Sequence, residues 1–164
     1  MRRFVEFLIM CAASTLASGA LAADAPSTAD VLAKVHAANQ REIDMGRMAI
    51  LTGGSKDVRK LGKTVVKDHL ALEKKVAKLA KDEHVTLAET GPASGADALP
   101  QGDSFDASFE ERMLSSHRDA ITELEQARAT TTDERLKKLI DEILPVLHKH
   151  EDAAQHLLDE TRRS

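Results

Sequence analysis

Four polar residues with metal-binding side chains stand where amphipathic helices would normally present apolar ones. The clearest is His150, which lies seven residues from both Ile143 and Leu157 in the sequence. Residues seven apart share one face of a helix, so an imidazole occupies a position that usually holds leucine. The other three members of this set are Glu42, His69 and His117. Imidazole favours Zn, Cu, Fe or Ni over Mg or Ca, so the chemistry they indicate is transition-metal binding.

Four further polar residues flank this set and are secondary candidates: Asp68, Glu73, Glu110 and His148. Glu73 follows His69 by four residues and therefore shares its helical face. Helical bundles build metal sites from inward-pointing groups on several helices. The sequence thus predicts a site for one transition-metal ion (Fe, Cu or Zn), with Glu42, His69, His117 and His150 as its ligands.

Two other interpretations of the same residues remain open. A buried histidine can hydrogen-bond to a carboxylate on the next helix, which gives a polar layer that fixes helix register without binding metal. The chain would then be a structural or envelope-interaction bundle. Alternatively, bound iron or copper would make it an oxidoreductase. We expect a binding protein with a metal-handling or stress-protective role rather than an enzyme, and the sequence offers no phosphate loop or nucleophile elbow.

The elements that must position these residues are four amphipathic segments, at 28–51, 55–84, 104–129 and 132–161. Ser27 with Asp30, and Thr131 with Glu134, resemble capping boxes at the starts of the first and last helices. The linker 86–102 contains Pro92, and when extended it reaches roughly 56 Å. That exceeds the roughly 42 Å of a helix of about 28 residues. The sequence therefore predicts an all-α, ferritin-like four-helix bundle, in which a long crossover joins two antiparallel hairpins.

The first 22 residues have the features of a secretory signal peptide. Arg2 and Arg3 form a basic start, an apolar stretch spans 7–17, and Ala22 ends a small-residue cleavage site. Cleavage after Ala22 would remove Cys11, the only cysteine, and leave a single domain at 23–164. Thiol chemistry is thereby excluded, and we expect a periplasmic protein.

Composition restricts the partners. The net charge of −4 argues against nucleic acid, and the lack of Trp and Tyr argues against stacking platforms for nucleotides or sugars. No second apolar run could span a membrane after processing. Lysines follow the outer side of the second segment, a pattern typical of a solvated face, with a lipid-headgroup site as the alternative. They are Lys60, Lys63, Lys67, Lys74, Lys78 and Lys81. An envelope partner or a homo-oligomer remains open.

Four segments carry a family resemblance: AANQREIDMGRMA, VVKDH, FDASFEERMLSSH and ILPVLHKHEDAAQHL. In this order they resemble the bacterial domain-of-unknown-function family 4142, which consists of exported, ferritin-like helical proteins. The resemblance covers about residues 30–158, and its most specific parts are the Asp-His pair at 68–69 and the Leu-Pro-x-Leu-x-x-His run at 144–150. It implies that Glu42, Asp68, His69, His117 and His150 occupy the family's characteristic polar positions. It brings no established activity.

The sequence also departs from true ferritins. Those proteins carry Glu-x-x-His on two helices, and this chain has no such motif. Val66 stands where the bridging carboxylate before His69 would be, and Phe109 stands where relatives often have Tyr. A di-iron ferroxidase is therefore disfavoured.

Overall fold

The computed structural model describes residues 26–89 and 99–163, so the predicted signal peptide and its cleavage site lie outside the described residues. Its elements are α1 (Thr28–Thr52), α2 (Lys56–Asp82), the 3₁₀ turn η2 (Gly102–Ser104), α3 (Phe105–Thr130) and α4 (Glu134–Thr161). The described part of the chain contains no strand. None of its helices combines the length and the apolarity that a membrane crossing needs.

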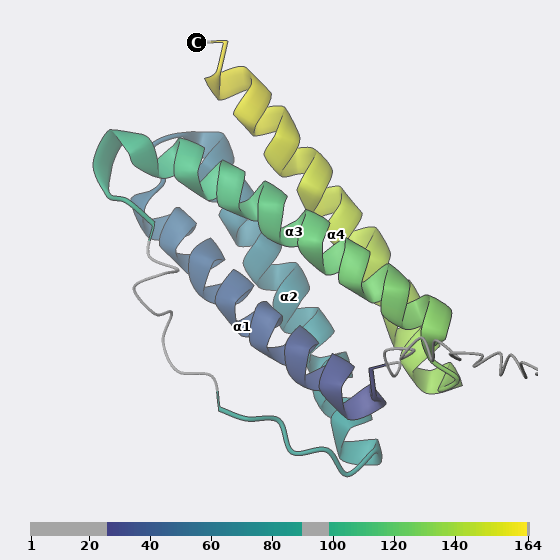
Figure 1. The fold of residues 1–164 in the computed structure, drawn as a ribbon. Helices are drawn as coiled ribbons and strands as arrows, with labels where there is room; N and C mark the ends of the chain where they lie inside the picture. Colours follow the sequence, from purple (N-terminus) through teal and green to yellow (C-terminus); the bar gives the residue numbers. More distant parts are fainter. Residues whose placement is uncertain (1–25, 90–98, 164) are drawn as a thin grey trace, which may run out of the picture.

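The four helices form two antiparallel hairpins, α1 with α2 and α3 with α4 (Figure 1). After α2 the chain returns to the other end of the bundle, so α3 begins beside the start of α2. The backbone amides of Gly54 and Ser55 hold the two starts together, donating to the Asp106 carboxylate at 2.8 and 2.7 Å. Helices α2 and α3 are therefore parallel. This confirms the predicted ferritin-like bundle with its long crossover.

Side-chain caps fix where the helices begin. The predicted capping box at Ser27 is present at the start of α1. At α4 the expected box at Thr131 is wrong, because Asp133 is the cap and accepts from the amides of Arg135 and Leu136 at 2.9 and 3.3 Å. A carboxylate can accept both amides and also complements the positive end of the helix dipole. Thr131 instead accepts from the Asp133 amide at 3.2 Å, so α4 begins at Glu134 rather than at residue 132.

The apolar core is divided into two clusters along the bundle axis. One contains Leu32, Val76, Leu124 and Ile140, together with their neighbours. The other contains Met45, Val65, Phe109 and Ala154, together with theirs. Buried polar residues from all four helices lie at the depth between them: Asn39, Glu42, His69, His117 and His150. The fold thus places a polar layer at mid-bundle.

Glycines let α1 and α2 approach closely beside this layer. A Cβ atom on Gly62 would lie 2.7 Å from the Gly46 carbonyl oxygen and 2.9 Å from the Ala49 Cβ. A Cβ on Gly46 would lie 2.9 Å from the Gly62 carbonyl oxygen. Backbone atoms cannot yield as the end of a side chain can, so only glycine fits at both positions.

We predict that Gly62→Ala destabilises the protein, although alanine is the better helix former. Alanine would contribute about 1 kcal/mol through helix propensity. Forcing α1 and α2 apart costs about 1–3 kcal/mol, so we expect a net loss of about 1 kcal/mol. Thermal unfolding followed by circular dichroism at 222 nm measures it. A variant as stable as the wild type would show that the two helices can separate without loss of packing.

Candidate metal centre

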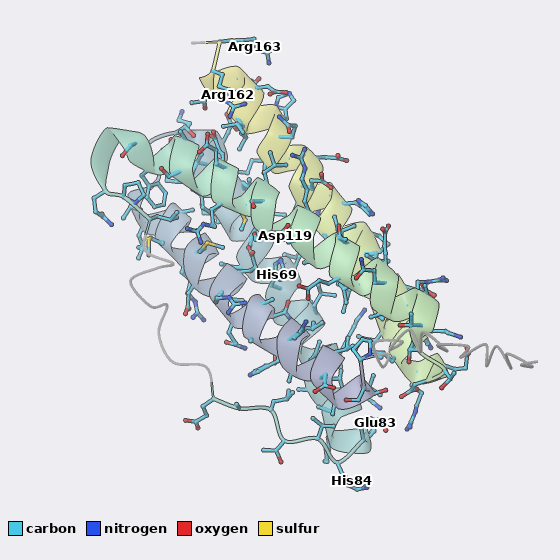
Figure 2. All side chains as sticks on the ribbon, in the orientation of Figure 1. His69, Glu83, His84, Asp119, Arg162 and Arg163 are labelled. Atoms are coloured by element: carbon cyan, nitrogen blue, oxygen red, sulfur yellow. The ribbon has the colours of Figure 1, made fainter. Side chains whose placement is uncertain are left out.

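Three histidines from three helices meet in the middle of the bundle. His69 of α2, His117 of α3 and His150 of α4 are only 1–2 % exposed, and Figure 2 shows His69 in the bundle interior. Their ring centroids are 5.3–5.6 Å apart. Each ring offers one nitrogen, and these nitrogens all lie within 4.8 Å of one another. Among the described residues this is the only group of three or more metal-binding side chains so closely placed.

Hydrogen bonds determine which nitrogen carries the proton in two of these rings. The Nδ1 atom of His117 is 2.9 Å from the carbonyl oxygen of Met113, which can only accept. Nδ1 is therefore the protonated nitrogen, and Nε2 keeps its lone pair. In His150 the Nε2 atom is 3.1 Å from Asp68 Oδ2, so here Nε2 donates and Nδ1 keeps the lone pair. Each ring is oriented by a partner outside the group of three histidines.

Asn39 performs the same role for His69. Its Nδ2 donates to Glu73 Oε2 at 3.1 Å, and its Oδ1 is 2.8 Å from His69 Nδ1. The amide oxygen can only accept, so His69 Nδ1 is protonated and Nε2 is not. Nε2 is buried and has no hydrogen-bond partner in the described part of the chain. An unpartnered buried lone pair is unfavourable unless a cation or a donor reaches it.

The lone pairs of His117 and His150 face each other directly. His117 Nε2 and His150 Nδ1 are 3.3 Å apart. A hydrogen bond between them would need a proton on one of the two nitrogens, and a neutral ring that carried its proton there would lose its bond to Met113 or Asp68. In the tautomers that the outer bonds select, the two acceptors repel. A cation between them would turn this repulsion into coordination.

Burial keeps these rings neutral near pH 7. Desolvation, together with the neighbouring His117 and His150, lowers the pKa of His69 to about 3. Desolvation likewise lowers the pKa of His117 to about 4, and it lowers that of His150. At neutral pH the ring nitrogens that face one another therefore stay unprotonated. Three neutral imidazoles in fixed tautomers are the form in which histidine binds transition metals.

Glu42, the fourth predicted ligand, lies beside this group and not within it. Its Oε1 accepts from Ser116 Oγ at 2.7 Å and is 3.9 Å from His117 Nδ1, the nitrogen that bonds to Met113. Its Oε2 is buried without a hydrogen-bond partner among the described residues. Burial raises the pKa of Glu42 to about 7. The carboxyl therefore approaches the side of His117 away from His150.

The structure separates the four secondary candidates into two pairs. Asp68 and Glu73 belong to the site as orienting groups, for His150 directly and for His69 through Asn39. Glu110 is buried near the start of α3, where Thr161 Oγ1 donates to it at 3.4 Å. His148 is half-exposed beside Glu151, with 3.7 Å between the ring nitrogen and the carboxylate.

Contacts within the polar layer link all four helices in a closed ring. One contact joins each neighbouring pair, in the order α1–α2, α2–α4, α4–α3 and α3–α1. The contacts are Asn39–His69, Asp68–His150, His150–His117 and Ser116–Glu42. Asn39 and Ser116 are not among the site residues predicted from the sequence. Only their positions beside predicted ligands could have indicated them, because Asn39 lies one turn before Glu42 and Ser116 directly precedes His117.

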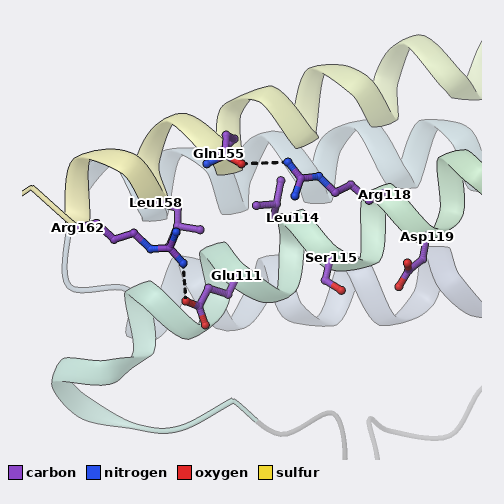
Figure 3. A pocket seen from close by; sticks show the side chains of 8 residues that line it. All are labelled: Glu111, Leu114, Ser115, Arg118, Asp119, Gln155, Leu158 and Arg162. Atoms are coloured by element: carbon purple, nitrogen blue, oxygen red, sulfur yellow. Dashed lines mark hydrogen bonds and ion pairs between the residues drawn. The ribbon is translucent and has the colours of Figure 1, made fainter.

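A surface cleft between α3 and α4 is a second candidate binding site, but it is unsuited to a charged ligand. Its two arginines already have partners on its walls or rim (Figure 3). Arg118 donates to Glu151 at 2.8 Å and to Gln155 at 3.0 Å, while Arg162 donates to Glu111 at 3.2 Å. The histidine group is therefore the candidate site.

Comparisons with known proteins agree with this fold. Three solved structures of CopM superpose on the chain, in forms described as Ag-bound by soaking, Cu(II)-bound and Cu(I)-bound. Their TM-scores are 0.69, 0.70 and 0.70, at 19%, 19% and 18% sequence identity. The matches cover 83%, 80% and 82% of this chain and 97%, 95% and 97% of CopM. At this identity the likeness establishes a shared fold. A comparison with curated proteins finds no match.

The resemblance seen in the sequence is confirmed by a profile match. The profile described as "Domain of unknown function (DUF4142)" matches residues 13–157, a range that includes the whole polar layer. The chain belongs to the DUF4142 family.

Proposed function

We propose that this protein binds one copper ion between His69, His117 and His150 and serves as a periplasmic metal-handling or stress-protective protein. The observation that carries the proposal is the convergence of three buried, unprotonated ring nitrogens, each set by a hydrogen bond on the far side of its ring. Such outer partners orient ligands and increase their basicity.

The donor set argues against iron, and the fold shared with copper-bound CopM favours copper over zinc. Iron sites of the non-haem type combine two histidines with a carboxylate, and here no carboxylate lies within the group. Structural zinc sites are closed by a fourth protein ligand, which this group lacks, but catalytic zinc sites use three histidines and a water, so the donors alone do not separate copper from zinc. Copper accepts three imidazoles. CopM, which has this fold, is described in Cu(I)- and Cu(II)-bound forms, and this supports the choice.

The test is the metal content of the protein. Chains purified from their own host, and chains dialysed against buffered Cu(I), Cu(II) or Zn(II), are analysed for bound metal. We expect one copper ion per chain after dialysis and a weaker uptake of zinc. A protein that takes up none of the three metals would overturn the proposal, because the three histidines would then be a structural layer only.

Metal binding should also be insensitive to mild acid. The three imidazoles are already unprotonated, and the pKa values of His69 and His117 lie at about 3 and about 4. Between pH 6.5 and pH 5 we expect copper affinity to change by less than about threefold. Three ordinary histidines with a pKa near 6.5 would lose roughly four thousandfold over the same range. Equilibrium dialysis at fixed free copper measures the dependence, and a steep loss would show that the rings are solvated.

A further inference from the structure

The outer face of α2 carries a row of lysines that the metal site does not use. Its seven members, here called the lysine row, are Lys56, Lys60, Lys63, Lys67, Lys74, Lys78 and Lys81. At 100° per residue they fall within an arc of about 60°, and they span 25 residues, or about 38 Å of helix. All seven are exposed. The row is therefore straight, narrow and nearly as long as the bundle.

The charge of this row is not balanced locally. Only Lys78 forms an ion pair among the described residues, with Asp82 at 2.7 Å. The acidic residues of α2 lie outside the arc, and they are Asp57, Asp68, Glu73 and Asp82. Counting nine basic and four acidic side chains, α2 has a net charge of +5 in a chain whose net charge is −4. The net charge of α2 is thus positive, while that of the rest of the chain is negative.

One apolar side chain completes the pattern. The lysines follow one another at intervals of three or four residues, except between Lys67 and Lys74, and Leu70 occupies the position that is skipped. Leu70 is 41% exposed, and it is one of only two large hydrophobic side chains exposed in the described part of the chain. On a surface that the lysines contact, Leu70 would reach the boundary between headgroups and acyl chains, where apolar side chains of membrane-bound helices lie.

We propose that α2 docks lengthwise on an anionic lipid bilayer through the lysine row, with Leu70 at the boundary between headgroups and acyl chains. Lysine is a flexible point charge suited to a diffuse array of phosphates, whereas defined bidentate recognition of a carboxylate or phosphate uses arginine. The row carries no aromatic side chain on which nucleic-acid bases could stack. Docking in this way turns the acidic remainder of the bundle away from the membrane. The proposal does not depend on metal binding.

Vesicle flotation with the full-length processed chain tests this docking. We expect binding to vesicles of phosphatidylglycerol and phosphatidylcholine, no binding to phosphatidylcholine alone, and weakening as salt shortens the screening length. The variant Lys63→Gln/Lys67→Gln/Lys74→Gln should bind about a hundredfold more weakly, since each lysine near an anionic surface contributes about fivefold. These side chains are exposed, so circular dichroism should show an unchanged fold. Leu70→Gln should bind severalfold more weakly with the same salt dependence.

The matched control removes three lysines elsewhere, as Lys34→Gln/Lys137→Gln/Lys138→Gln. It has the same net charge as the row variant and should bind like the wild type within about threefold. Equal losses in the two triple variants would reduce the effect to net charge and overturn the docking surface. Equal binding to neutral and anionic vesicles would overturn it as well. Retention on a soluble polyanion such as heparin, without binding to anionic vesicles, would assign the row to a polyanionic partner and reject the membrane.

Discussion

Replacing His150 by leucine is expected to abolish copper uptake while leaving the apoprotein folded. In the wild type, copper at a hundred times its dissociation constant should stabilise the folded state by about 2.7 kcal/mol. For a domain of this size that corresponds to a rise in Tm of about 5–10 °C. The variant lacks the nitrogen that faces His117 at 3.3 Å, so this rise should disappear. Thermal unfolding with and without copper measures the effect, together with metal content after dialysis.

The apoprotein should tolerate this change because the site loses a repulsion. Leucine continues the apolar stripe between Leu147 and Ala154, and it removes one of two facing lone pairs. Asp68 loses the His150 bond but keeps Lys149 Nζ at 3.2 Å, and it is partly exposed to water. The free energy of unfolding without metal should therefore fall by less than about 1 kcal/mol.

His148→Leu is the matched control. His148 lies two residues away on the same helix, is half-exposed and contributes nothing to the histidine group, so its variant should keep the full response to copper. The opposite pattern would contradict the metal site. The polar layer would only fix helix register if two results occurred together. The Tm of the wild type would not change with Cu(I), Cu(II) or Zn(II), and His150→Leu would be strongly destabilised.

The sequence predicted the three central histidines because helix geometry is local. A period of 3.6 residues places His69, His117 and His150 on apolar stripes, whatever the neighbouring helices do. Their common depth follows from helix lengths and from the crossover, which the length and prolines of the linker indicate. Fold and histidine group were therefore accessible without a structure.

The partners of these histidines were less accessible because they depend on helix rotation and depth. Asn39 and Glu42 are one turn apart on the same face of α1, and the carboxylate was the predicted ligand. Which of the two reaches His69 depends on how α1 sits against α2, and the close approach of Gly46 and Gly62 is part of that fit. Such a contact between helices leaves no periodic signal in either helix alone.

Two secondary candidates show the same limit within a single helix. Glu110 shares a face with His117, but seven residues separate them by about 10 Å along the axis. It therefore lies near the end of the bundle, against Thr161. His148 is two residues from His150, which turns it about 200° around the helix and toward solvent. Glu110 therefore has the right face of its helix but the wrong depth, and His148 has the right depth but the wrong face.

Glu42→Gln is expected to stabilise the apoprotein at pH 8 and to change its stability by less than about 1 kcal/mol at pH 5. Burial raises the pKa of Glu42 from 4.5 to about 7. Between these values the folded chain holds a proton that the unfolded chain releases, so stability falls as pH rises. At 1.36 kcal/mol per pH unit the loss approaches about 3 kcal/mol by pH 8. Glutamine cannot ionise, and its oxygen can still accept from Ser116. Urea unfolding at pH 5 and pH 8 should show a gain of about 2–3 kcal/mol only at the higher pH.

The same variant decides whether Glu42 is a metal ligand, as the sequence predicted, or a neighbour of the site, as its position indicates. We expect Glu42→Gln to keep one copper ion with an affinity within about threefold of the wild type, because His117 turns a different nitrogen toward the metal. Glu110→Gln is the matched control, since burial also raises the pKa of that carboxyl, far from the histidines. It should gain stability at pH 8 and leave copper binding unchanged. A loss of copper affinity beyond tenfold in Glu42→Gln alone would place the Glu42 carboxylate in the coordination sphere, and the site would then hold four protein ligands.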